Sequence, residues 1–248
     1  MTLFAAASMQ NDRSGANLGT LACFATRKSS PGTRFLLSAS HVIYEGGRTP
    51  GQGLKICSPN SGSCCCTKNS VAVATDPGFY GEVGGVFIDC AIALLNSDQV
   101  GVNQNPALAA GAQPPAGGGP NPGSYITGSA DAVDGEAVRV VTWKTPTAIQ
   151  GTVQTGQVAK AVVDGGVVSR PGQLWITVAK ADAQTVVEGS GDSGAAVVNR
   201  FNQVVGLMWG RGVTDPNSIS QESTIIFACP IGPVLTALEI AIPSDVPA

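Results

Sequence analysis

Three side chains that lie far apart in the sequence have the types needed for nucleophilic catalysis: His41, Asp89 and Ser193. A serine hydroxyl is a weak nucleophile until a neighbouring base accepts its proton. A histidine can be that base, and a carboxylate that accepts its other N–H fixes the imidazole tautomer. Asp89 stands at the head of a strongly apolar segment, where a carboxylate is costly unless it accepts hydrogen bonds. The chain therefore offers a base, an orienting group and a nucleophile.

The serine lies in an unusual stretch, VEGSGDSGAAVV at 187–198, where glycines and an acid directly precede an apolar, strand-like segment. One interpretation is a tight turn, because glycine and aspartate are common turn residues. The other is a serine held at high exposure and surrounded by backbone N–H groups. His41 is the only histidine, and a lone histidine is usually structural, so the choice depends on the elements that bring these residues together.

Short β-rich segments dominate the chain, and clusters of glycine, proline, asparagine and aspartate separate them. With 32 glycines and 16 prolines, this pattern is typical of an all-β barrel or sandwich. The predicted strands are 18–26, 34–40, 53–57, 70–75, 87–95, 136–143, 148–156, 173–179, 195–199, 203–210 and 223–229. A helix is expected at 230–242, where a proline precedes apolar residues at three- and four-residue intervals, namely Val234, Leu235, Leu238 and Ile242.

The stretch 103–123 is rich in glycine, proline and alanine and carries no charge, which is typical of a linker. Roughly six predicted strands precede this stretch or end near it, and roughly six follow it. We therefore expect two antiparallel six-stranded β-barrels of similar size. The first, at 14–102, carries the histidine and the aspartate, and the second, at 124–248, carries the serine and the terminal helix.

Composition excludes several classes of protein. Hydrophobic residues make up 43% of the 248 residues and charged residues 12%, which favours a compact globule over a disordered chain. The net charge is −3 with no basic run, so the electrostatic footprint of nucleic-acid binding is missing. No apolar run approaches the roughly 20 residues that span a bilayer. The N-terminal segment is a poor signal peptide, which slightly favours the cytoplasm over secretion unless the chain was trimmed from a longer one.

The seven cysteines are an odd number, which argues against a complete disulfide framework. Cys23, Cys90 and Cys229 lie in apolar segments and are expected to be buried as small hydrophobic residues. Cys57 and the triplet 64–66 lie in a glycine- and serine-rich loop. Free thiols are the main expectation there, with a disulfide from Cys57 to the triplet and a metal site as alternatives.

Segments along the chain, taken in order, resemble the motifs of the trypsin/chymotrypsin-fold serine proteases in their bacterial form. LLSASHV around His41 is similar to the histidine motif of that family, IDCAIALL around Asp89 to its aspartate motif, and GDSGAAVV around Ser193 to its nucleophile motif. VVGLMWG resembles the strand that lines the substrate cleft, and STIIFACPIGPVLTAL the last strand and C-terminal helix. Each motif alone is weak, but together they cover about residues 16–240.

The resemblance implies a serine endopeptidase that cleaves protein or peptide substrates through an acyl-enzyme, with no cofactor or metal. Ser193 would attack the carbonyl, His41 would transfer the proton, and Asp89 would orient the imidazole. The amides of Gly191 and Ser193 would form the oxyanion hole, where losing one donor costs about 3 kcal/mol. A glycine at 191 lets its N–H turn into the site, and Gly194 lets the chain pack closely as it enters the next strand.

The residues that the resemblance places in the substrate pocket are Val187, Glu188, Trp209 and Arg211. A valine at the pocket floor would suit an apolar side chain, an inward glutamate would favour arginine or lysine, and Arg211 would instead add positive charge. These alternatives stay open. A histidine-lined pocket for glutamate is excluded, because the sequence has no second histidine.

Asp192 has two interpretations. In relatives of the implied family, the matching acid pairs with a new N-terminus or with an internal arginine, and the candidates here are Arg139 and Lys144. The alternative is a solvated turn aspartate.

Two further functions compete with a simple endopeptidase. One is a catalytically silent binding module with a protease fold, and the other is a protease gated by the cysteine-rich loop through metal or redox chemistry. The oligomeric state is not predicted.

Overall fold

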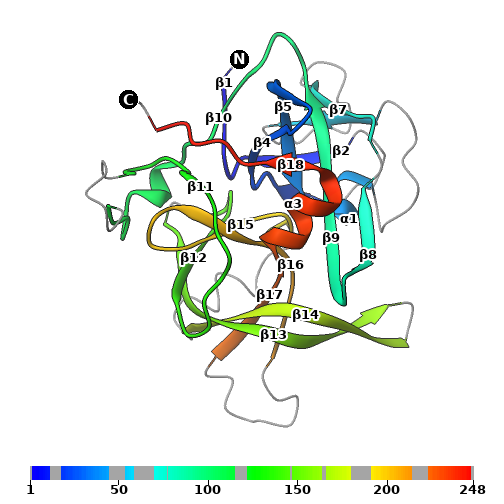
Figure 1. Cartoon of the computed structure of the whole chain (residues 1–248), viewed down its shortest axis with the longest axis vertical. Helices are drawn as coiled ribbons and strands as arrows, with labels where there is room; N and C mark the ends of the chain where they lie inside the picture. Colours follow the sequence, from blue (N-terminus) through cyan, green and yellow to red (C-terminus); the bar gives the residue numbers. More distant parts are fainter. Residues whose placement is uncertain are drawn as a thin grey trace.

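The structure is a computed structural model that describes residues 2–11, 18–44, 54–58, 70–76, 78–114, 122–145, 147–163, 166–179, 191–213 and 223–246. Strands dominate, and all but one pair of them gather into two large sheets that correspond broadly to the two halves of the chain (Figure 1). This arrangement confirms the all-β fold with two barrels.

The first half of the chain forms a nine-stranded sheet that includes one strand from the C-terminus. Its order is β18-β4-β5-β9-β7-β6-β2-β3, and β8 pairs with β9. The strands are β2 (Ser8–Asn11), β3 (Gly19–Thr20), β4 (Cys23–Arg27), β5 (Ser30–Ser38), β6 (Leu54–Cys57), β7 (Ser70–Ala74), β8 (Phe79–Val83), β9 (Val86–Leu95) and β18 (Ile240–Ala241). Helix α1 (Ser40–Tyr44) follows β5, and β1 (Thr2–Phe4) pairs separately with β10 (Val100–Val102).

The second half forms a closed ring of strands. β16, β15, β12, β13, β14 and β17 pair in this order, β17 pairs again with β16, and β11 adds to the outer side of β16. These strands are β11 (Gly128–Ser129), β12 (Ala137–Val141), β13 (Ile149–Val163), β14 (Gly166–Ala179), β15 (Ala196–Val198), β16 (Gln203–Val213) and β17 (Ser223–Pro230). The ring is the six-stranded barrel expected for this half.

Strand β9 is apolar along most of its length because each of its faces contacts a different core. Successive side chains of a strand point to opposite faces. Ile88, Cys90 and Ile92 pack in the cluster that joins the two halves, whereas Ala91 and Ala93 pack inside the first sheet. A strand buried on both sides needs no alternation of polar and apolar residues, and this one carries Asp89 into the interior.

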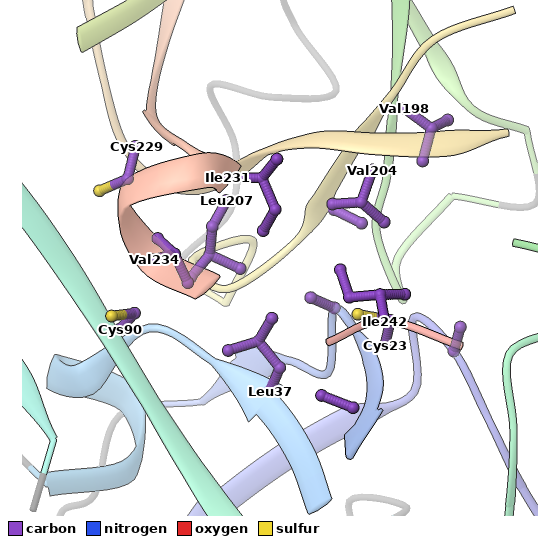
Figure 2. Packing of buried hydrophobic residues seen from close by; sticks show 14 of the residues in the cluster. Cys23, Leu37, Cys90, Val198, Val204, Leu207, Cys229, Ile231, Val234 and Ile242 are labelled. Atoms are coloured by element: carbon purple, nitrogen blue, oxygen red, sulfur yellow. The ribbon is translucent and has the colours of Figure 1, made fainter. Parts of the chain in front are cut away.

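The core cluster that joins the halves fixes how they meet. In Figure 2, Leu37 of β5 and Cys90 of β9 lie on one side, and Leu207 of β16 and Val234 of the C-terminal helix lie on the other. All of these side chains are buried. Burial of apolar surface stabilises a contact by about 25 cal/mol per Å². The same cluster therefore stabilises both barrels and their relative placement.

The C-terminal helix is shorter than the predicted 230–242. Helix α3 (Ile231–Leu238) ends because Glu239 adopts the left-handed conformation, with φ at 54°, and its N–H bonds back to the last turn. The next residues form β18, which pairs with β4 of the first sheet. Ile242 is buried on this extended segment, so a long-range strand pairing outweighs the local helical spacing. No helix in the described ranges is long and apolar enough to cross a membrane.

The predicted linker at 103–123 begins as ordered structure. The buried side chain of Asn103 accepts from the N–H of Phe24 at 2.6 Å and donates to its carbonyl at 2.9 Å. A short 3-10 helix, η1 (Pro106–Leu108), then buries Leu108. The Asn103 contacts attach the start of the segment 103–123 to β4. The barrel boundaries at 14–102 and 124–248 stay a prediction.

Candidate active site

His41 and Asp89 are in direct contact. Helix α1 begins directly after β5 and places His41 in its first turn, while β9 supplies Asp89. The imidazole Nδ1 lies 2.6 Å from Asp89 Oδ2, and the backbone N–H of His41 donates to Asp89 Oδ1 at 3.1 Å. The aspartate side chain is 1% exposed and the histidine side chain 23%. One buried carboxylate thus holds both the ring and the main chain of His41, and the exposed part of the ring can meet a reactant.

Ser193 lies where the second half of the chain touches the first. Its carbonyl accepts from the N–H of Thr20 at 2.8 Å, and the next residue, Gly194, donates its N–H to the carbonyl of Met208 at 2.7 Å. Gly194 has a φ of +90°, and a Cβ there would lie 2.0 Å from Ser38 Oγ. The close packing expected at this glycine is present, and it brings Ser193 beside the segment that leads into His41.

The hydroxyl of Ser193 donates to the carbonyl of Trp209 at 3.4 Å. Within the ranges that the structure describes, no hydrogen bond joins Ser193 to His41. The structure therefore assembles the histidine–aspartate pair directly, and it places the serine at the same junction with its hydroxyl turned toward β16.

Gly191 is held by both halves of the chain. Its φ is 114°, and its carbonyl accepts from the Thr20 hydroxyl at 2.9 Å and from the Trp143 indole N–H at 3.1 Å. Among the described residues, no protein acceptor binds the backbone N–H of Gly191 or of Ser193. No described protein group therefore competes for these two N–H groups.

Asp192 is buried, so the interpretation as a solvated turn residue is wrong; it is 4% exposed, and its Oδ1 has no hydrogen-bond partner in the described structure. Burial raises the pKa of Asp192, and the charges of Lys144 and Arg211 and the hydroxyl of Thr142 oppose that rise. Lys144 is thus a charge neighbour, as expected. Arg139 is not the partner, because its guanidinium donates elsewhere, to the carbonyls of Leu108, Ala110 and Asn199 and to Asn202 Oδ1.

Of the four predicted pocket residues, Val187 and Glu188 lie outside the described residues. Trp209 is buried on β16, and its ring stacks on Phe227 with centroids 5.4 Å apart. Its carbonyl faces the Ser193 hydroxyl, which places this part of β16 next to the candidate nucleophile. Arg211, two residues further along β16, is exposed.

A buried arginine that the sequence analysis did not identify covers Trp209. The Arg170 guanidinium lies 4.1 Å from the centroid of Trp209, 4.3 Å from that of Phe87 and 5.2 Å from that of Tyr80, and it also bonds the Tyr80 hydroxyl. Gln173 accepts the Trp209 indole N–H at 2.5 Å. β14 is thereby joined to β8 and β9. Residues from four strands build this contact, and no local pattern relates them.

The states of the cysteines agree in part with those expected from the sequence. Cys23, Cys90 and Cys229 are free and buried, which confirms their expected role. Burial raises the pKa of Cys23 to about 12, and burial likewise raises the pKa of Cys90 and of Cys229. Cys229 also accepts the backbone N–H of Asp89 at 3.3 Å, so it supports the strand that carries the carboxylate.

Cys57 is disulfide-bonded, so the expectation of a free thiol is wrong for this residue. Cys57, at the end of β6, lies opposite Ser70, at the start of β7, in the antiparallel pairing of these two strands. The triplet 64–66 lies outside the described residues. In the described ranges, no group of histidine, cysteine, aspartate or glutamate side chains could hold a metal ion.

A scan against protein-family models finds no match, and a comparison with curated proteins finds none either. Solved structures do match. The Cellulomonas bogoriensis chymotrypsin aligns with a TM-score of 0.59 and 15% identity over 98% of each chain. The Nocardiopsis protease NAPase aligns with a TM-score of 0.61 and 16% identity over 98% of this chain and 100% of that one.

A third solved structure is a glutamic acid specific serine protease that uses a histidine triad in substrate binding. It aligns with a TM-score of 0.61 and 16% identity over 97% of this chain and 100% of that one. This chain has a single histidine, so it has no counterpart of that triad. At such identities the likeness establishes the fold, and it does so over almost the full length. The chain has the two-barrel fold of the chymotrypsin-like serine proteases.

Proposed function

We propose that this chain is a serine endopeptidase in which Ser193 is the nucleophile, His41 the general base and Asp89 the group that orients it. The observation that carries the proposal is the 2.6 Å contact between His41 Nδ1 and the buried Asp89 Oδ2. It fits the chemistry because a carboxylate facing Nδ1 favours the tautomer with the proton on Nδ1, and that tautomer leaves Nε2 as an acceptor. The fold and the position of Ser193 at the same junction support the assignment.

Peptide cleavage would proceed in two halves. Ser193 Oγ attacks the carbonyl carbon while His41 Nε2 takes the hydroxyl proton, and the proton then passes to the leaving amine as the peptide bond breaks. In the second half, water attacks the carbonyl carbon of the acyl-enzyme while His41 takes a proton from it. The proton passes to Ser193 Oγ as the ester bond breaks, and the second product leaves. The Asp89 carboxylate stabilises the charged imidazole, and its burial keeps that interaction in a low-dielectric setting.

The backbone N–H groups of Gly191 and Ser193 would bind the oxygen that becomes negative during attack. Both lack a protein acceptor in the described structure, and both belong to the turn that carries the nucleophile. Donors that are already in place lower the barrier because nothing has to reorganise as the charge develops.

Before substrate binds, the Ser193 hydroxyl donates to the Trp209 carbonyl. Catalytic hydrogen bonds are often long or misaligned without substrate and tighten in the complex. The proposal therefore requires this hydroxyl to leave Trp209 and turn to His41 when a peptide enters.

The same hydrogen bond favours the second candidate, a catalytically silent binding module with the protease fold. A serine that stays bonded to Trp209 would never lose its proton to His41. The two functions differ in one measurable property, which is the reactivity of Ser193 toward acylating and phosphonylating reagents.

A fluorophosphonate probe tests the proposal, because it reacts with activated serines and leaves a stable adduct. Folded protein is incubated with the probe at neutral pH, digested and mapped by mass spectrometry. We expect the label on Ser193, and its loss in the His41→Ala variant and in denatured protein. Folded wild-type protein that takes no label would overturn the proposal and favour the binding module.

A further inference from the structure

We propose that Thr20 and Trp143 are positioning residues that hold the oxyanion hole in its working shape through the carbonyl of Gly191. The Thr20 hydroxyl donates to this carbonyl at 2.9 Å, and the Trp143 indole N–H donates to it at 3.1 Å. The inference rests on the proposed function, because the hole has a role only if Ser193 attacks a carbonyl.

The orientation of the Gly191 carbonyl determines how the two N–H groups of the oxyanion hole point relative to each other. It belongs to the peptide unit between Gly191 and Asp192, and this unit lies between the two N–H groups that would bind the oxyanion. Peptide units are planar, so rotation of this unit changes the relative direction of the N–H groups on either side of it. Two donors on one carbonyl oxygen resist that rotation, since both hydrogen bonds must break before the unit turns.

Glycine makes such support necessary. Gly191 adopts a φ of 114°, a conformation that glycine reaches without a steric penalty. The same freedom leaves other conformations of the turn close in energy. A side chain at this position cannot restrict the turn, so the restriction has to come from outside it. The Leu18 side chain also packs against the turn, since its atoms lie 3.5 Å from the place that a Cβ on Gly191 would occupy.

The two donors come from opposite halves of the molecule. Thr20 lies on β3 of the first sheet, and Trp143 follows β12 of the second barrel. Thr20 is fully buried and also donates its N–H to the Ser193 carbonyl at 2.8 Å, so one residue holds both ends of the tripeptide 191–193. The Thr20 carbonyl in turn accepts from Ser38 Oγ at 2.8 Å, three residues before His41. The same contacts therefore link the base and the oxyanion hole.

A positioning role predicts a specific kinetic pattern. The developing oxyanion is the species that needs both N–H groups, so loss of support raises the barrier of the chemical step and leaves ground-state binding nearly unchanged. We expect Thr20→Val and Trp143→Phe each to lower kcat roughly 10- to 100-fold with KM changed less than about 3-fold, because small misplacements of catalytic groups cost about that much. Thr20→Ser keeps the hydroxyl that bonds the Gly191 carbonyl and should therefore retain most of the wild-type kcat.

Matched variants control for the loss of a buried group. Trp175 has a buried indole N–H without a partner in the described structure, so Trp175→Phe removes a tryptophan and no hydrogen bond. Thr26 on β4 is buried, and its hydroxyl makes no hydrogen bond among the described residues, so Thr26→Val is the corresponding control. Both should turn over substrate like the wild type.

The experiment measures kcat and KM on a peptide substrate for these variants, together with the inhibition constant of a peptide boronic acid, whose adduct on Ser193 places an oxygen in the hole. In Thr20→Val and Trp143→Phe, the inhibition constant of the boronate should rise by the same factor by which kcat falls. At least one of the two variants should keep the melting temperature of the wild type. If the wild type is active and both variants match the controls, this inference fails alone. A wild type without turnover or fluorophosphonate labelling overturns the proposed function, and this inference with it.

Discussion

Replacement of Gly194 by alanine tests how tightly the two halves of the molecule meet. A Cβ at this position would lie 2.0 Å from Ser38 Oγ and 2.4 Å from the Thr20 carbonyl oxygen, and φ is +90°. The left-handed backbone costs an alanine roughly 1–2 kcal/mol, and overpacking a tight site costs roughly 1–3 kcal/mol. We therefore expect Gly194→Ala to lower the free energy of unfolding by about 2–5 kcal/mol.

A second glycine separates the two contributions. Gly85 has a φ of +79°, and a Cβ there would meet nothing within 4 Å, so Gly85→Ala carries the backbone strain without the clash. Urea unfolding followed by intrinsic fluorescence gives both free energies. Gly194→Ala should be less stable than Gly85→Ala by about 1–3 kcal/mol. Equal destabilisation of the two variants would refute the close contact between Gly194 and the first half.

Three other measurements follow from the site and its surroundings. Asp89→Asn should lower kcat roughly 10⁴-fold because His41 takes the wrong tautomer, and a loss below about 10-fold in a folded variant would argue against the assigned role. Burial raises the pKa of Asp192, so the wild type loses stability as pH rises above the ordinary aspartate range. The free energy of unfolding of Asp192→Asn should therefore increase relative to that of the wild type as pH rises from 3 to 7, measured by urea titration of both proteins. A difference between the two proteins that does not change with pH would contradict this. The buried thiols Cys23, Cys90 and Cys229 should resist alkylation at pH 8 until the protein unfolds, and peptide mapping that finds any of them modified in native protein would show that the core opens.

Much of the fold could be predicted because apolar strands are separated by turn residues, and these patterns are local. Strand β9 is an example, since its apolar run marks a strand buried on both faces. The full lengths of β13 and β14 could not be predicted, since β13 continues past the predicted 148–156 and β14 begins before the predicted 173–179. The end of α3 could not be predicted, because the pairing of β18 with β4 joins residues about 200 positions apart. A helical spacing that continues to Ile242 carries no information about that pairing.

The candidate site divides in the same way. His41 and Asp89 could be identified because each lies in a characteristic local setting, and their contact is present in the structure. Thr20, Trp143 and Arg170 could not, because their roles depend on contacts across the two halves. Arg139 was a reasonable partner for Asp192 by its position on β12, but the carbonyls of the connecting segment, such as that of Leu108, bind it instead.

The central claim is that the hydroxyl of Ser193 attacks a carbonyl with help from His41. It is tested most directly by mixing the protein with an activated ester, quenching in acid within one turnover, and locating the acyl group by peptide mapping. The account predicts one acyl group per molecule on Ser193, formed in a burst that His41→Ala and Ser193→Ala both abolish. A folded wild-type protein that shows no burst, or acylation that persists unchanged in the His41→Ala variant, would contradict it.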